Sequence, residues 1–216
     1  MDNIIRFTQT DLTKYTKQRS GEIKFGERMH TVPRGEDMLE FIKQSDAQFV
    51  MIGIPEDIGI RANFGRPGAD KAWESTLKNL VNLHHNKFNK AGGLLVLGQL
   101  DVADKMAQSE GLDPYNKEQR KKLMELVSAL DKEVSHTVCQ IITAGKIPII
   151  VGGGQNNAYG NIKGMALAKG KPVNAINFDS TTDFKLMEGR HSSNGFSYAF
   201  EDGFLKNYFI FGLHEN

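Results

Sequence analysis

The fold is decided by residues 147–184, which read IPIIVGGGQNNAYGNIKGMALAKGKPVNAINFDSTTDF. An apolar run at 147–151 ends in three glycines, a weakly periodic stretch follows at 157–168, and a second run occupies 173–178. Short runs of this kind, bounded by glycine or proline, are typical of strands buried in parallel sheets. Strands separated by a helix in this way imply a parallel sheet with helices on its faces.

The same alternation of apolar runs and helical patterns continues on both sides of this stretch. Further strands are predicted at 48–54, 94–97 and 208–213. Further helices are predicted at 36–44, 69–89 and 113–145. Residues 1–35 are polar and weakly periodic, so we interpret them as an arm, which together with the short helix forms a segment at 1–47. Residues 48–216 are then one α/β domain with a mostly parallel sheet and helices on both faces.

Two of the predicted helices carry local features that can be checked. The apolar stripe on 69–89 includes His84, which we therefore interpret as a buried core residue. The helix at 113–145 is predicted to begin at Asp113-Pro114, because aspartate is a common N-cap and proline is favoured in the first turn.

The composition excludes several classes of function. The 216 residues include 27 Lys plus Arg and 26 Asp plus Glu, so a net charge of +1 gives no basic excess for binding nucleic acid. The single cysteine, Cys139, excludes a disulfide framework and a thiolate metal site. The apolar runs are far shorter than a membrane span, and the first residues lack a signal-peptide core. We therefore expect a cytoplasmic protein without membrane contact.

Polar loops follow three of the predicted strands, at the positions where functional groups of open α/β sheets gather. In the last of them, Asp179 and Asp183 come directly after a strand, and two carboxylates at this spacing can converge on a hard cation. Capping of a turn is the alternative interpretation of the same pair. The glycines at 152–154 can form either an anion-binding nest or a tight turn, and they do not complete a dinucleotide fingerprint.

Taken in order, these loops resemble the ureohydrolase (arginase-like) family, and in particular its formimidoylglutamase branch. The resemblance is carried by GIPEDIGIRANFGRPGADKAW (53–73), PIIVGGGQNNAYGNIKG (148–164), NAINFDSTTDF (174–184), EGRHSSNGFSYA (188–199) and GLHEN (212–216). It implies a three-layer α/β/α sandwich. It also implies hydrolysis of a C–N bond of a linear amidine or guanidine, in which two Mn²⁺ ions share an activated hydroxide.

The sequence departs from the family pattern at the metal ligands. The resemblance implies six of them: a His closing a Gly-Gly-x-His loop, an Asp-x-His-x-Asp set, and two aspartates of a later Ser-x-Asp-x-Asp motif. Asp179 and Asp183 match the middle aspartates, Gln155 and Thr181 stand where the family has His, and the later motif does not occur in this sequence. Neutral oxygens offset little of the charge of two divalent ions, so we expect no Mn²⁺ or one weakly bound ion, and lost or impaired catalysis.

The loop at 188–195 supplies the remaining candidates. His191 is a candidate for proton transfer because imidazole titrates near neutrality, and an idle surface histidine is the alternative. By the resemblance, Ser193 and Asn194 are candidates for contacts with a small-molecule substrate. Glu188 and Arg190 are predicted to pair with each other.

Three functions stay open at this point. The first is a ureohydrolase-family protein with a degraded metal site, the second an active hydrolase completed by another chain, and the third a module that binds a small polar or anionic ligand at 152–157. The last predicted strand ends three residues before Asn216, where such a sheet would continue. We therefore also expect a homo-oligomer, or a partner that covers the open edge of the sheet.

Overall fold

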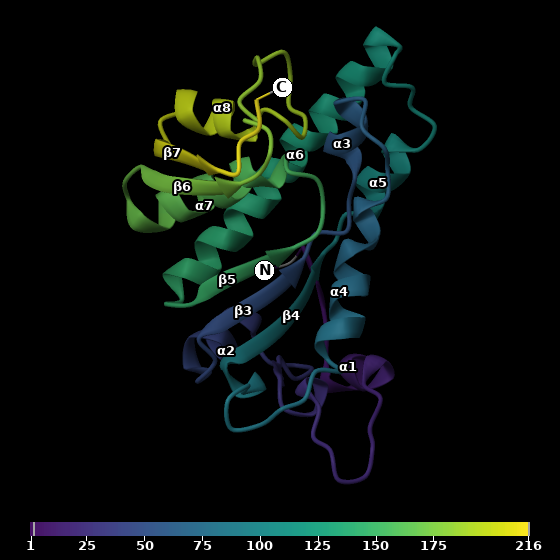
Figure 1. Cartoon of the computed structure of the whole chain (residues 1–216), viewed down its shortest axis with the longest axis vertical. Coiled ribbons are helices and arrows are strands. Elements are labelled where there is room, and N and C mark those ends of the chain that lie inside the picture. The colour runs from purple at the N-terminus through teal and green to yellow at the C-terminus, as the bar shows by residue number, and fades with distance from the viewer. Residues whose placement is uncertain (2, 216) are drawn as a thin grey trace. The chain divides into compact units, whose positions relative to one another are not determined.

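The computed structural model describes residue 1 and residues 3–215, which form two compact units (Figure 1). Unit 1 comprises Met1–Pro55, Ala69–Asp101 and Ile141–Gly153. Unit 2 comprises Glu56–Gly68, Val102–Gln140 and the chain from Gly154 onward. Asn216, the last residue of the GLHEN motif, lies outside the described residues. Each unit is therefore assembled from stretches that are distant in the sequence.

Unit 1 is built on a five-stranded sheet. Its main strands lie in the order β1 (Ile4–Arg6), β4 (Leu94–Leu100), β3 (Phe49–Gly53) and β5 (Ile147–Val151), and β2 (His30–Thr31) also pairs with β4. Only β1 is antiparallel to its neighbour among these described pairings. The predicted mostly parallel sheet is thus confirmed, and the segment expected to be an arm contributes two of its strands.

The helices of unit 1 pack against this sheet. They are α1 (Gln9–Tyr15), α2 (Met38–Gln44) and α4 (Ala72–Leu80), with 3-10 turns at Phe25–Glu27, Ala69–Lys71 and Ala91–Gly93. Trp73 and Leu77 of α4 are buried in one apolar cluster with Met51 of β3 and Val96 of β4. Since apolar side chains of helix and strands share this cluster, its burial fixes α4 on the sheet.

The helix predicted at 69–89 ends earlier than expected. The carbonyls of Val81 and Leu83 accept hydrogen bonds from the backbone N–H groups of Gly26 and Phe25, so they are not available for further helical turns. Beyond this point the chain is irregular, and the His84 side chain is 60% exposed. The prediction that His84 is a core residue is therefore wrong.

Unit 2 contains a two-stranded parallel sheet of β6 (Val173–Phe178) and β7 (Leu205–Phe211). Its helices are α3 (Ile58–Ala62), α5 (Ala103–Ser109), α6 (Lys117–Thr143, in this unit as far as Gln140), α7 (Asn157–Lys169) and α8 (Gly195–Glu201). Tyr159 and Ile162 of α7, Phe196 and Ala199 of α8, and Leu205 of β7 form one buried cluster. The two helices thus cover one face of the β6–β7 sheet.

The long helix α6 begins at Lys117 rather than at Asp113. The side-chain oxygen of Asn116 accepts hydrogen bonds from the backbone N–H groups of Glu118 and Gln119, which makes Asn116 the cap. Asp113 instead accepts from the N–H of Tyr115 in a preceding turn. None of the described helices, α6 included, is both long and apolar enough to cross a bilayer.

The contact between β3 and α4 leads to a prediction about stability. A Cβ added at Gly53 would overlap the ring of Trp73, so Gly53→Ala is expected to lower the free energy of unfolding by about 1–3 kcal/mol. Urea denaturation measures this change. Gly92→Ala is the control, because its added Cβ has no atom within 4 Å. Equal losses of stability in the two variants would contradict the prediction.

Candidate functional site

The candidate site lies in unit 2, in the loop that follows β6. Asp179 comes directly after this strand, and its Oδ1 accepts hydrogen bonds from the backbone N–H of Thr181 at 3.0 Å and the Thr181 hydroxyl at 3.3 Å. These bonds, the backbone one above all, lower the pKa of Asp179, and the side chain of Gln155 adds a further hydrogen bond to the carboxylate. The structure therefore brings together three of the four positions that the resemblance assigns to metal ligands.

Asp183 completes this group. Its side chain is buried, and its backbone has a φ of 44°, in the left-handed region that is uncommon for residues with a side chain. Burial, and then the charge of Asp179, raise the pKa of Asp183, while hydrogen bonds from the hydroxyls of Ser193 and Thr181 act in the opposite direction. Among the residues that the structure describes, its buried Oδ2 has no hydrogen-bond partner, which is unusual for a polar atom and makes this oxygen available to a cation or a proton.

A chain of amide and hydroxyl groups that the sequence did not indicate holds Gln155. The Gln155 Nε2 donates to Asn177 Oδ1 at 3.2 Å, Asn177 Nδ2 donates to the Tyr208 hydroxyl at 3.0 Å, and that hydroxyl donates to the Thr182 carbonyl at 2.9 Å. Burial raises the pKa of Tyr208 to about 12, so the phenol stays protonated and keeps its role as a donor. The loop after β6 is thereby tied at Thr182 to Tyr208 of β7, and Gln155 is tied to Asn177 of β6.

The buried carboxylate of Glu56 is a second feature that the sequence did not indicate. It is fully buried, and its Oε1 accepts from the Gly154 N–H at 2.8 Å and from the side-chain amides of Asn156 at 3.1 Å and Asn157 at 2.7 Å. Its Oε2 accepts from the Ile58 N–H at 2.8 Å. The donors on which an anion-binding loop would depend are therefore occupied by a carboxylate of the chain itself. An external anion would have to displace it.

Arg190 is a buried cation in the same unit, and it pairs with the carboxylate of Asp131. Its Nε donates to Asp131 Oδ2 at 2.7 Å and its Nη2 to Asp131 Oδ1 at 3.2 Å, and the guanidinium lies between the rings of Tyr159 and Tyr198. Burial raises the pKa of Asp131 to about 6, against the charge of Arg190, so the carboxyl is mostly ionised at neutral pH. Arg190 and Asp131 therefore form an ion pair that is buried away from water.

The predicted pairing of Glu188 with Arg190 is wrong. Glu188 points to the surface and forms an ion pair with Arg120 at 2.6 Å, whereas Arg190 turns inward to Asp131. Side chains two residues apart point to the same side of an extended strand. Gly189, with a φ of 122°, interrupts that regular geometry between Glu188 and Arg190, so the two side chains point in different directions. Sequence proximity alone favoured a pair that the backbone separates.

Asn194 and Ser193 occupy the positions suggested for substrate contacts. The Asn194 side chain is buried, accepts from Arg190 Nη1 and the His191 N–H, and donates to the carbonyls of Leu186 and Gly189. Its polar atoms are therefore used within the loop. Ser193 Oγ accepts from the Asn63 side chain at 2.8 Å and lies beside Asp183. A contact of either residue with substrate stays a prediction.

His191 is buried rather than exposed, so the alternative of an idle surface histidine is wrong. The ring is 1% exposed, and its Nδ1 accepts from the Ser193 N–H at 3.2 Å, while its Nε2 lies 3.6 Å from a carboxylate oxygen of Glu188. Burial lowers the pKa of His191 to about 4, so the imidazole is neutral at pH 7. Its participation in proton transfer stays a prediction.

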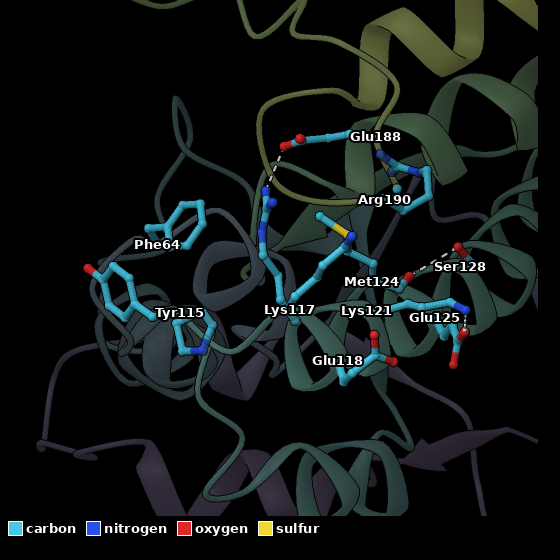
Figure 2. Close-up of a pocket in the computed structure, with 13 residues that line it drawn as sticks. Phe64, Tyr115, Lys117, Glu118, Lys121, Met124, Glu125, Ser128, Glu188 and Arg190 are labelled. Atoms are coloured by element: carbon cyan, nitrogen blue, oxygen red, sulfur yellow. Dashed lines mark hydrogen bonds and ion pairs between the residues drawn. The ribbon is translucent and has the colours of Figure 1, made fainter.

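A cavity of about 740 Å³ lies beside the N-terminal half of α6. Figure 2 shows Phe64 and Tyr115 on one side of it and Glu188 and Arg190 on another, with Met124 between them. The four positions assigned to metal ligands do not line it. The cavity and the pair of aspartates after β6 are therefore separate features of unit 2.

The side chains gathered after β6 carry mainly oxygen donors. The group consists of two carboxylates, the amide of Gln155 and hydroxyl groups, and it includes no imidazole. Among the described residues, no three His, Cys, Asp or Glu side chains gather as a potential metal-binding group.

Comparison with known proteins gives a consistent family assignment. Residues 47–216 match the model of the arginase family. A formimidoylglutamase of Chromobacterium violaceum is 29% identical over 150 residues, which cover 69% of this chain and 40% of that protein. A formimidoylglutamase of Clostridium tetani is 31% identical over 157 residues, which cover 67% of this chain and 38% of that protein. The chain thus spans about half or less of the length of these relatives.

Solved structures show the same relationship at the level of the fold. The formiminoglutamase of Trypanosoma cruzi, solved with Mn²⁺, has a TM-score of 0.60 at 23% identity over 89% of this chain and 58% of that one. The formimidoylglutamase of Bacillus subtilis has a TM-score of 0.67 at 16% identity over 92% of this chain and 55% of that one. This likeness confirms the arginase-like α/β fold predicted from the sequence.

The Arg190–Asp131 ion pair is buried, whereas Glu188 in the Arg120–Glu188 pair is half exposed, so we expect the two pairs to contribute differently to stability. Arg190→Leu leaves Asp131 buried and unpaired and is expected to lower the free energy of unfolding by about 3–5 kcal/mol. Glu188→Gln, which removes the half-exposed partner of Arg120, is the control and is expected to cost less than about 1 kcal/mol. Chemical denaturation at pH 7 compares them. Similar losses in both variants would show that Arg190 is not an interior anchor.

The low pKa of His191 predicts a pH dependence of stability. Between its ordinary value of 6.5 and about 4, the unfolded chain binds a proton that the folded chain does not, so acidification through this range favours unfolding. Wild type is expected to lose on the order of 2–3 kcal/mol more than His191→Gln does between pH 7 and pH 4.5. Exposed His136 on α6 supplies the control, His136→Gln, which should behave as wild type. Identical pH profiles for all three proteins would contradict the prediction.

Proposed function

The chain belongs to the arginase family, and on that premise we propose that it is a formimidoylglutamase-like member with a degraded binuclear metal site. Hydrolysis of the C–N bond of a linear amidine, the reaction that its resemblance implies, is then lost or strongly impaired in this chain. One observation carries the proposal: where the resemblance places imidazole ligands, the chain has the amide of Gln155 and the hydroxyl of Thr181.

Charge is the physical basis of this proposal. Two divalent ions bring four positive charges, while Asp179 and Asp183 together supply at most two negative ones. The raised pKa of Asp183 shows that even this second negative charge is disfavoured by burial and by its neighbour. The Gln155 amide nitrogen is already committed to Asn177. The side chains after β6 therefore lack the means to replace the hydration of a metal pair.

A single hard cation fits the same residues better. All the donors are oxygen atoms of carboxylate, amide or hydroxyl groups, which suit Mg²⁺, Ca²⁺ or Mn²⁺ rather than softer metals. The partnerless, buried Oδ2 of Asp183 is an available ligand atom beside Asp179. We include in the proposal that the site holds at most one such ion, with low affinity.

An active hydrolase completed by another chain is the second candidate function. This chain covers only 40% and 38% of the two relatives described above, so a hydrolase of that length contains residues beyond the ones in this chain. The lost imidazoles at positions 155 and 181 argue against it, because a second chain would have to supply replacements for ligands that belong to this one. The first proposal needs no such replacement.

Restoration of the two imidazoles tests the metal proposal. Wild type dialysed against Mn²⁺ is expected to retain less than one ion per chain, and Gln155→His/Thr181→His is expected to bind Mn²⁺ at least about tenfold more tightly. Thr182→His, which adds an imidazole at the exposed neighbouring position, should bind as wild type does. Titration calorimetry and metal analysis provide the values. Two tightly held ions in wild type would overturn the proposal.

The activity proposal has its own test. The chain, loaded with Mn²⁺, is expected to release no formamide from N-formimidoyl-glutamate above the rate with Mn²⁺ alone. Asp179→Ala is the matched control, since it removes one of the two retained carboxylates. A rate of release in wild type that disappears in Asp179→Ala would contradict the loss of activity and favour the second candidate function.

A further inference from the structure

Unit 1 contains a cavity of about 270 Å³, whose walls come from stretches that are distant in the sequence. Phe7 follows β1, Tyr15 ends α1, Trp73 belongs to α4, and Gln99 lies near the end of β4. Pockets for drug-sized ligands usually measure roughly 300–1,000 Å³, so this cavity suits a small chemical group. Among the described residues, none lines both this cavity and the larger one beside α6.

Three aromatic rings form much of the wall. Trp73 is buried, and Phe7 and Tyr15 pack against the apolar cluster to which it belongs. The rings of Phe7 and Trp73 lie 5.9 Å apart at an angle of 57°, so they present surfaces in different directions rather than one flat stack. An aromatic face carries partial negative charge and attracts a cation that lies over it. Several rings around one small cavity are typical of sites that recognise quaternary ammonium groups.

The charged part of the wall adds a free carboxylate. Asp70, Lys71 and Glu74 all line the cavity. Glu74 is exposed and already pairs with Lys78 at 2.8 Å, and Lys71 is exposed, so water screens its charge. The half-buried carboxylate of Asp70 has no hydrogen-bond or ion-pair partner among the described residues. Asp70 is therefore the group whose charge is available to a ligand, and it attracts a cation.

The rest of the wall determines which kind of cation fits. Besides the rings, Pro55 and Leu77 contribute apolar surface. An ammonium or guanidinium group with several N–H donors leaves water at a high cost unless each donor finds an acceptor. A quaternary ammonium group has no donor to satisfy, and its charge is spread over methyl groups that pack on apolar and aromatic surfaces. The wall therefore favours the quaternary group over a primary amine.

We propose that this cavity of unit 1 binds the quaternary ammonium group of a small organic cation. The rings of Phe7, Tyr15 and Trp73 surround its methyl groups, and the carboxylate of Asp70 is the counter-ion. The residues at positions 155, 179, 181 and 183 belong to unit 2 and take no part in this binding. The measurement of cation binding is therefore independent of the metal content and of amidine hydrolysis.

Trp73 makes the test specific, because it is the only tryptophan of the chain and it lines the cavity. Choline chloride is the probe, and 3,3-dimethylbutan-1-ol, which has the same shape without the charge, is its matched control. At constant ionic strength, choline is expected to change the Trp73 emission saturably, with a dissociation constant of about 1 mM or lower. The neutral alcohol is expected to bind at least about tenfold more weakly. Titration calorimetry provides a second readout.

Substitutions assign the binding to the cavity. Asp70→Asn removes the counter-ion and is expected to weaken choline binding at least about fivefold. Asp46→Asn, which changes an exposed aspartate of unit 1 outside the cavity, should bind as wild type does. Tyr15→Phe keeps the ring and should retain binding, whereas Tyr15→Leu removes the ring and should weaken binding at least about fivefold. Circular dichroism that matches wild type verifies that each variant keeps the fold.

Three results would overturn the proposal. The first is the absence of any change in Trp73 emission and of any heat of binding up to tens of millimolar choline. The second is equal affinity for choline and the neutral alcohol, because burial of apolar surface alone would then explain the binding. The third is an equal loss of affinity in Asp70→Asn and Asp46→Asn, because the counter-ion would then not be the carboxylate of the cavity.

Discussion

Glu56, a buried carboxylate that has no cationic partner among the described residues, imposes the main constraint on unit 2. Both carboxylate oxygens of Glu56 accept hydrogen bonds. The donors are the backbone N–H groups of Ile58 and Gly154 and the side-chain amides of Asn156 and Asn157. Since an unsatisfied buried charge costs several kcal/mol, these donors must stay in place for the unit to fold. The same arrangement aims the Asn156 carbonyl at Arg190, which in turn neutralises Asp131. The loop before α7 and the loop before α8 are therefore positioned by one electrostatic network.

This network is independent of the positions that the resemblance assigns to metal ligands. The groups that set the loop positions, Glu56 and Arg190, are distinct from the four residues at which metal ligands are expected. Replacement of imidazoles by Gln155 and Thr181 leaves the network intact, because Gln155 bonds to Asn177 and Thr181 to Asp179. Each substituted side chain has thus found a local hydrogen-bond partner. On the proposed function, the stability of the scaffold and the affinity for metal would then be separate properties of this chain.

Features that local interactions determine were predicted correctly from the sequence. Features that depend on contacts between residues distant in the sequence were not. The strands 147–151 and 173–178 are found at the predicted residues, because apolar runs bounded by glycine and proline define them locally. The helix predicted to reach residue 89 ends at Leu80, because residues 25 and 26 capture the carbonyls beyond it. In the candidate site, the loop after β6 was predictable from its two aspartates. Glu56 was not, since the three donors to its Oε1 lie about a hundred residues away in the sequence.

The phenol of Tyr208 links two parts of unit 2 that otherwise have different chemistry. Its ring stacks on Phe196 of α8 at 4.4 Å, while its hydroxyl bridges Asn177 and the Thr182 carbonyl beside the aspartates. A shift of α8 is thereby transmitted to the acidic loop by a rigid side chain rather than absorbed by a flexible one. Substitutions in the hydrophobic interior of α8 will consequently change the spacing of polar atoms in the loop. Selection for packing alone would thus continue to preserve the loop geometry in a lineage that no longer used it for catalysis.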